Sequence, residues 1–129
     1  MRYLTVAELV AISEREVGPD LLADFGLLES AALRPQTTIG GHDAYPGIHD
    51  KAAALVHSIA RNHAFIDGNK RTAAIALGVF CVMNGYRLTM SDDELIALIL
   101  DAAEGQIDVP AIAGVVKAHL VEIPAREGF

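Results

Sequence analysis

The longest apolar stretch of the chain, from Ala73 to Met83, does most to constrain the fold. It is well short of the roughly 18 to 20 apolar residues that a helix needs to span a bilayer, so it predicts a buried helix and no membrane segment. Asn84 and Gly85 follow it as a typical helix C-cap. The stretch is apolar on nearly every side, and we therefore expect a central helix from about Asn69 to Met83 that is packed all round.

Length and composition favour one globular domain, residues 1–129. The chain has 129 residues, of which 52% are hydrophobic, which is enough for one core and too short for two ordinary domains. Its formal net charge of -7 and low aromatic content argue against a direct nucleic-acid partner. The lone Cys81 cannot form an internal disulfide, and acidic residues follow the start too soon for a signal peptide. These features predict a cytoplasmic protein that contacts no membrane.

Further helices are expected from capping residues and apolar spacing. They run from the Thr5 capping box to Gly18, from Asp24 to Pro35, from about Ile48 to Arg61, from the Ser91 capping box to about Ala103, and from Asp108 to about Leu120. The irregular segment Gln36–Gly47 predicts a loop or small flap, and Tyr86–Leu88 a short extended link. The predicted fold class is an all-α domain of about six helices.

The chemistry concentrates in the ten residues from His63 to Thr72, which read HAFIDGNKRT and run into the predicted central helix. The first N–H groups of a helix have no intrahelical partner and lie at the positive end of its dipole. Gly68 permits a tight turn that an anion can approach closely, and Asn69, Lys70 and Arg71 would surround that anion. Arginine suits bidentate contact with phosphate oxygens, whereas lysine acts as a mobile point charge. This arrangement predicts a phosphate site.

His63 and Asp67 add a base and a metal ligand to that site. The unperturbed pKa of histidine lies near working pH, so His63 can take a proton from an incoming hydroxyl. A carboxylate beside phosphates is costly without a divalent cation between them, and Asp67 therefore implies Mg²⁺. Phe65 and Ile66 are expected to fix the loop to the core through their apolar side chains.

Simpler readings of the same residues exist. A histidine at a helix end is often a cap or a surface residue, an aspartate before glycine is often a turn former, and Lys70 with Arg71 could be a solvated face. The co-occurrence of all four features in one register favours the functional interpretation. The five histidines show no zinc spacing, and His57 is expected to be a partly buried helix residue. The segment GNKRT lacks the upstream glycine and strand of a P-loop, which excludes a Walker-type ATPase.

The motif resembles that of the Fic/Doc superfamily, and more narrowly that of the Doc (death-on-curing) toxins of bacterial toxin–antitoxin pairs. The segments DFGLLESAALRP from Asp24, YPGIHDKAAALVHSIARNH from Tyr45 and VFCVMNGYRL from Val79 also resemble Doc segments, in the same order. The resemblance implies that His63 is the base, Asp67 the Mg²⁺ ligand, and Gly68 and Asn69 the anion-binding turn. It implies that Lys70 and Arg71 contact the phosphates of ATP.

Two departures from the adenylylating Fic pattern, HPFx[D/E]GNGRxxR, bear on the reaction. This chain has Lys70 in place of a glycine and Ala74 in place of an arginine; Ala64 for proline is milder. The resemblance to Doc, which shares the lysine, implies an ATP bound in reverse, with its γ-phosphate toward the base. The implied reaction is phosphorylation of a Thr or Ser hydroxyl on a translation factor, with elongation factor Tu as the expected target.

Three hypotheses are therefore carried forward. The first is a Mg²⁺- and ATP-dependent protein kinase toxin that inhibits translation, and the second is a protein AMP transferase using the same residues. The third is a catalytically inactive Fic/Doc binding module. The resemblance also implies restraint by a Phd-like antitoxin, whose C-terminal segment would fold into a groove on the domain. By the same resemblance, Gln36–Gly47 would be a flap that holds the target peptide by strand addition.

Overall fold

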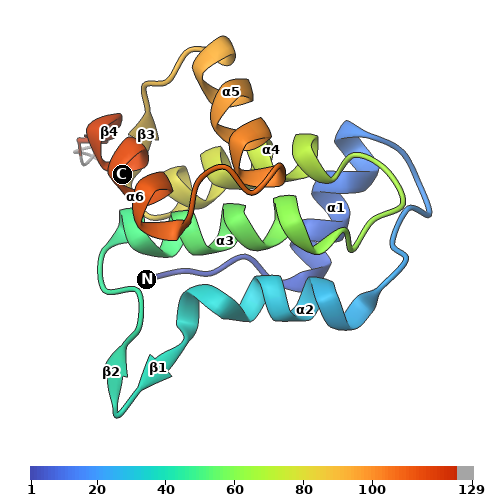
Figure 1. Ribbon diagram of the computed structural model, residues 1–129, viewed down its shortest axis with the longest axis horizontal. Coiled ribbons are helices and arrows are strands. Elements are labelled where there is room, and N and C mark those ends of the chain that lie inside the picture. The colour runs from blue at the N-terminus through green and yellow to red at the C-terminus, as the bar shows by residue number, and fades with distance from the viewer. Residues whose placement is uncertain (125–129) are drawn as a thin grey trace, which may run out of the picture.

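A computed structural model describes residues 1–124 of the chain. These residues form six α-helices with a 3₁₀ turn and two small sheets (Figure 1). The helices are α1 (Val6–Glu16), α2 (Phe25–Leu33), α3 (Ile48–Asn62), α4 (Asn69–Met83), α5 (Asp92–Ala103) and α6 (Val109–Ala118). The 3₁₀ turn is η1 (Arg34–Gln36), and the strands are β1 (Thr38–Ile39), β2 (His42–Asp43), β3 (Tyr86–Leu88) and β4 (Leu120–Glu122). The predicted all-α class with about six helices is confirmed.

Helix α3 occupies the middle of the fold. Helices α2, α4, α5 and α6 all pack against it, and most of its residues are buried. Its consecutive alanines, Ala52 to Ala54, are completely buried, and their small side chains let the neighbouring helices approach closely. The large side chains that fill the space between helices include Leu55, Leu77 and Phe80.

Helix α4 has the predicted bounds, but it is not packed all round. Its buried face, which includes Leu77 and Phe80, lies on α3 and α1, whereas Val79 and Val82 are 37% and 57% exposed. The prediction of a central buried helix after the motif is therefore wrong in this respect. An apolar pattern on every side shows what a helix can bury, but the neighbours available decide what it does bury. The central place belongs to α3.

Local signals place several helix starts correctly. Thr5 and Ser91 both form complete capping boxes, with Glu8 and Glu94 respectively, and Asp24 and Asp108 accept N–H bonds at the starts of α2 and α6. In the described part of the chain, no helix is long and apolar enough to cross a membrane.

The ends of two predicted helices need correction. Pro35 does not end the helical path, because it occupies the first turn of η1, where its missing N–H is not needed. The last helix ends at Ala118, and Leu120 opens β4 instead. β4 pairs antiparallel with β3, so Tyr86–Leu88 is a strand with a long-range partner and not an isolated link.

Candidate active site

The motif loop, residues 63–68, connects α3 to α4 and is held through its backbone. The N–H groups of Ala23 and Asp24 donate to Ala64 O at 2.9 and 3.0 Å, and the Ile66 N–H donates to Leu21 O at 2.8 Å. Phe65 is buried as predicted, and it anchors the loop in the core. Ile66 is 73% exposed, so the prediction that it also fixes the loop is wrong; its backbone does so instead.

His63 ends α3 in a left-handed conformation, with φ 53° and ψ 45°. Such backbone angles are uncommon for residues other than glycine, and strained residues concentrate at functional sites. The side chain is exposed, and within residues 1–124 it has no hydrogen-bond partner closer than 3.5 Å. The ring is therefore available to accept a proton from a hydroxyl that enters from solvent.

Gly68 makes the turn into α4, and no other residue fits there without strain. Its φ is 75°, and a Cβ at this position would meet Val17 Cγ2 at 2.5 Å and Cγ1 at 2.6 Å. Val17 follows the last residue of α1, so the end of α1 forms one wall of the turn. The sequence pattern predicts the positive φ, but this contact between residues far apart in the chain was not foreseen.

Asn69 stabilises the loop with its side chain. Its Nδ2 donates to Phe65 O at 2.8 Å, and its Oδ1 accepts from the Phe65 N–H at 3.1 Å. Both ends of the amide are therefore occupied within the loop. The side chain of Asn69 is a positioning group, and any direct contact of Asn69 with an anion would use its backbone N–H. The sequence pattern predicts that Asn69 contacts the phosphate, and the clamping role of its side chain was not foreseen.

The first turn of α4 presents free donors and two cations. The Thr72 N–H makes the first helical bond, to Gly68 O at 2.9 Å, which leaves the N–H groups of Asn69, Lys70 and Arg71 outside the helical ladder. Lys70 and Arg71 are both exposed, and Arg71 Nη1 donates to Glu16 O at 3.4 Å, at the end of α1. Together with Val17 and Asp67 these residues line a cavity of about 330 Å³. This turn can bind a phosphate group.

Asp67 is the carboxylate of the same cavity. Its Oδ1 accepts the Gly68 N–H at 2.8 Å, and its side chain is exposed. No cluster of three or more His, Cys, Asp or Glu side chains in residues 1–124 could hold a metal ion by itself. A Mg²⁺ ion held by one carboxylate with phosphate oxygens and waters is a common arrangement, so the residues present fit that ion in company with a nucleotide.

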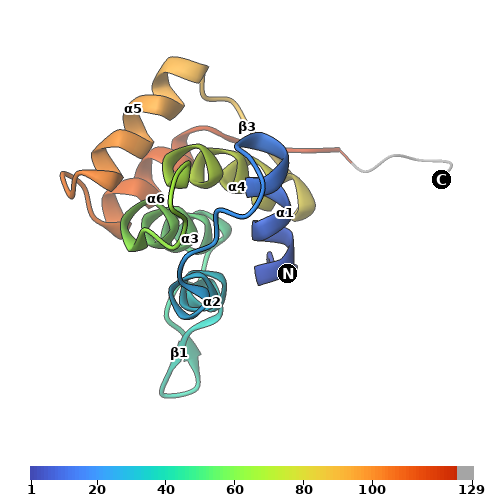
Figure 2. The same cartoon turned by 90° about the vertical axis from the view of Figure 1, so that its right-hand side faces the viewer.

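The segment Gln36–Gly47, predicted as a flap, forms the β1–β2 hairpin. Its two strands pair Thr38 with Asp43 and Ile39 with His42, and the hairpin projects from the helices (Figures 1 and 2). It precedes the N-terminus of α3, whereas His63 ends that helix, and Figure 1 shows the hairpin and the motif loop at opposite ends of it. The 15 residues of α3 span about 22 Å. A role in holding the target stays a prediction, and a peptide on this hairpin would need several more extended residues to reach the base.

Two buried or half-buried cations connect the hairpin stem to the core. Lys51, only 2% exposed, donates from Nζ to Asp43 Oδ2 at 3.2 Å. Arg34 Nε donates to the Tyr45 hydroxyl at 3.0 Å, and its Nη1 donates to His57 Nδ1 at 2.8 Å. Burial and the neighbouring arginines lower the pKa of His57. His57 is thus the half-buried structural histidine that its helical position predicts.

Comparisons with known proteins identify the family of the chain. Residues 3–81 match the model of the Fic/DOC family. The chain is 47% identical over 92 residues to Toxin Doc of Mycolicibacterium smegmatis (strain ATCC 700084 / mc(2)155), which covers 70% of this chain and 71% of that protein. It is 29% identical over 117 residues to Protein kinase doc of Escherichia phage P1, which covers 88% of this chain and 91% of that protein.

Proposed function

Because the chain belongs to the Fic/DOC family, within its Doc branch, we propose that it is a toxin that phosphorylates a protein at the expense of ATP. The reaction transfers the γ-phosphate of ATP to a Thr or Ser hydroxyl, and Mg²⁺ accompanies the nucleotide. One observation carries this proposal: a single short loop presents an exposed base and an exposed carboxylate beside an anion-binding turn that lines a cavity. The name of the phage relative, Protein kinase doc, supports the choice of reaction.

The proposed roles follow from the chemistry of each side chain. His63 takes the proton of the attacking hydroxyl, whose oxygen forms the new bond to phosphorus while ADP leaves. The N–H groups at the start of α4, with Lys70 and Arg71, bind the phosphate oxygens. Asp67 holds the divalent cation, which neutralises phosphate charge. Because phosphoryl transfer needs little covalent work from the protein, positioning and charge neutralisation supply most of the catalysis.

The proposed target is a translation factor, with elongation factor Tu as the first candidate, and the proposed site of action is the cytoplasm. Incubation with Mg²⁺, purified elongation factor Tu or bacterial lysate, and ATP labelled at either the α- or the γ-phosphate tests the reaction. Label transferred from the γ position alone supports the kinase, whereas label from the α position indicates an AMP transferase. Transfer from neither position, in folded protein, would exclude both enzymes.

The base assignment has its own variants. His63→Ala is expected to reduce transfer at least a hundredfold, within the usual range for loss of a general base. His119→Gln is the matched control, because His119 lies at the C-terminal end of α6, outside the motif. Full activity of His63→Ala would refute the assignment, provided that both variants unfold at the temperature of the parent protein.

We further propose that a Phd-like antitoxin restrains the protein through its C-terminal segment. The relative named Toxin Doc supports a partner of this class. A short reading frame beside the gene should encode it, and co-expression should allow both proteins to be purified together. Addition of the purified partner is expected to stop γ-phosphate transfer, and transfer that continues in a stable complex would contradict this role.

A further inference from the structure

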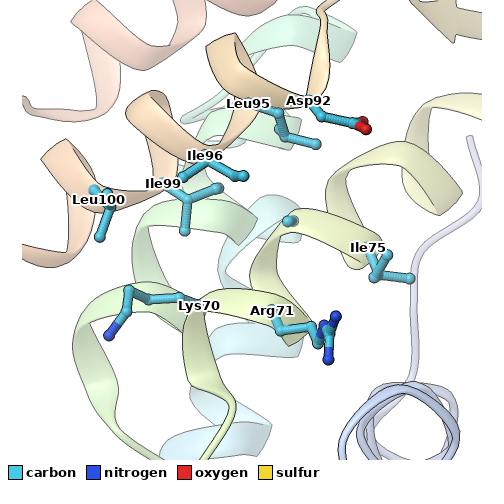
Figure 3. Close-up of a pocket in the computed structure, with 9 residues that line it drawn as sticks. Lys70, Arg71, Ile75, Asp92, Leu95, Ile96, Ile99 and Leu100 are labelled. Carbon is cyan, nitrogen blue, oxygen red and sulfur yellow. The ribbon is translucent and has the colours of Figure 1, made fainter.

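A largely apolar cavity of about 410 Å³ lies between α4 and α5. Figure 3 shows the apolar side chains of α5 directed toward the first turns of α4. Its charged residues are Lys70 and Arg71, which belong to the motif, and Asp92. Apolar walls of this kind do not define the chemistry of a ligand.

A cavity of different character lies between α3 and residues 104–108, which join α5 to α6. Its volume is about 470 Å³, within the range of small-molecule sites. It shares no lining residue with the motif cavity. Helix α3 contributes His57 and Arg61, which lie one turn apart on the same face of the helix. The other lining residues are Gly105, Gln106, Ile107, Asp108 and Ala111.

His57 carries a hydrogen-bond donor that a ligand can use. Its Nδ1 lies 2.8 Å from Arg34 Nη1. Because a guanidinium can only donate, Nδ1 accepts, and the proton of the neutral ring is on Nε2. Burial and the neighbouring arginines lower the pKa of His57, so the ring is neutral near pH 7. Within residues 1–124, Nε2 has no hydrogen-bond partner, and its N–H group is therefore available to an acceptor atom in the cavity.

Arg61 is held against the same loop by one end of its guanidinium. Its Nη1 donates to Ala103 O at 3.3 Å, at the end of α5. Gly105 has a φ of 75°, and a Cβ there would lie 2.5 Å from Arg61 Nη1, so a side chain at this position would displace the guanidinium. The other N–H groups of Arg61 have no partner in residues 1–124. They can donate to an anion that enters the cavity.

Asp108 is the acidic residue among those that line the cavity, and its charge is partly compensated. Its Oδ1 accepts the Ala111 N–H at 3.1 Å as the N-cap of α6, where the positive end of the helix dipole offsets part of the carboxylate charge. At His57, Arg34 and Arg61 lower the pKa more than Asp108 raises it. The field at this ring is therefore positive, although the whole chain has a formal net charge of -7.

We propose that this cavity binds a small organic oxyanion, either a carboxylate or a phosphate ester, through Arg61 and the Nε2–H group of His57. The planar guanidinium can donate to two anionic oxygens side by side, and the imidazole N–H group adds a further donor. Ile107 and Ala111 leave apolar surface for the organic part of the ligand. The site does not depend on the proposed kinase reaction, because it uses no residue of the motif.

A ligand in this cavity would contact the residue that orients Arg34 at the stem of the hairpin. Arg34 donates to His57 Nδ1 through Nη1 and to the Tyr45 hydroxyl through Nε. The tautomer that accepts from Arg34 is the same tautomer that donates from Nε2. An oxyanion at Nε2 therefore stabilises the form of His57 on which this contact with the stem depends.

Long-range proton–nitrogen NMR of the histidine rings tests the site, because each imidazole gives its own signals and shows which nitrogen carries the proton. The probes are butyl phosphate and butyrate, which share an organic chain and differ in the anionic group. Inorganic phosphate lacks the chain and 1-butanol lacks the charge, and sodium chloride at matched ionic strength is the blank. We expect a saturable shift of the His57 signals with one of the two organic anions, and about tenfold weaker binding of inorganic phosphate and 1-butanol.

Variants of Arg61 separate the site from other binding. Arg61→Gln should weaken binding of the organic anion at least tenfold, and Arg61→Lys, which keeps the charge and loses the planar fork, should weaken it less. Arg15→Gln is the matched control, because Arg15 has a side chain that is 79% exposed on α1 and does not line the cavity. It should bind as the parent protein does.

The affinities of the two organic anions identify the preferred anionic group. The absence of a saturable shift at His57 with both of them would overturn the proposal, as would equal affinity in Arg61→Gln and the parent protein. A shift confined to His63 would assign the binding to the motif turn and also overturn it. Equal binding of 1-butanol would indicate an apolar site and refute the role of the charge.

Discussion

The contact between Gly68 and Val17 offers a quantitative test of how the anion-binding turn is built. In Gly68→Ala the backbone of the alanine must keep a φ of 75°, and its methyl group would lie 2.5 Å from Val17 Cγ2. The left-handed backbone costs an alanine about 1 kcal/mol. Overpacking against a fixed neighbour costs about 1–3 kcal/mol more. The free energy of unfolding should therefore fall by about 2–4 kcal/mol.

Replacement of Val17 separates the two contributions. Val17 is half-buried, so Val17→Ala alone should cost about 1 kcal/mol through lost apolar contact. In the double variant Gly68→Ala/Val17→Ala the clash is gone, and only the backbone cost and the lost contact remain. The double variant should then be more stable than the sum of the single variants predicts, by about 1–3 kcal/mol.

Urea denaturation of the four proteins measures this interaction energy. Gly114→Ala is the control, because Gly114 lies in α6 and a Cβ there meets no atom within 4 Å. That substitution should stabilise the protein by about 0.5–1 kcal/mol. Additive effects of Gly68→Ala and Val17→Ala would refute the steric argument and leave only the backbone cost. An unchanged stability of Gly68→Ala would refute both.

Three further predictions concern groups away from the motif. Asp43→Asn should lower the free energy of unfolding by about 1–3 kcal/mol, and more than Lys51→Met does, because it leaves the buried ammonium without its anionic partner; urea denaturation checks the order. Burial raises the pKa of the Cys81 thiol to about 11, so the folded protein should react with a thiol reagent at pH 8 only after denaturant is added. Since burial and nearby arginines lower the pKa of His57, the unfolded state binds the proton more tightly; stability should fall as pH decreases from about 6.5 toward the lowered pKa, and His57→Asn should flatten that part of the profile.

Local signals in the sequence predict much of the fold. The capping boxes at Thr5 and Ser91 depend on residues three apart, and such signals place the starts of α1 and α5 correctly. The pairing of β3 with β4 depends on backbone groups more than 30 residues apart, and no local pattern marks it. For the same reason the exposure of Val82 was not foreseen, because it depends on how many neighbours α4 receives.

The sequence likewise predicts one part of the candidate site and not the other. The residue types in the loop indicate a base, a carboxylate and an anion-binding turn, and these follow from side-chain chemistry alone. The support of the loop does not follow from the residue types. The close approach of Val17 and the backbone hydrogen bonds that residues 21–24 make with the loop come from distant segments. The clamp formed by Asn69 is local, and an asparagine four residues after a buried Phe65 could have suggested it. The cavity between α4 and α5 depends on the relative positions of these two helices, which no sequence motif indicates.

The backbone attachment of the motif loop has a consequence for how such a protein can change. Because Ala64 O and the Ile66 N–H hold the loop, the exposed side chain of His63 contributes little to its shape, and that of Asp67 contributes one hydrogen bond, from the Gly68 N–H. A single nucleotide change in the gene can therefore remove the chemistry and leave a folded chain. Cells that escape the protein should carry substitutions at these two positions, and their extracts should still contain the full-length product at normal abundance.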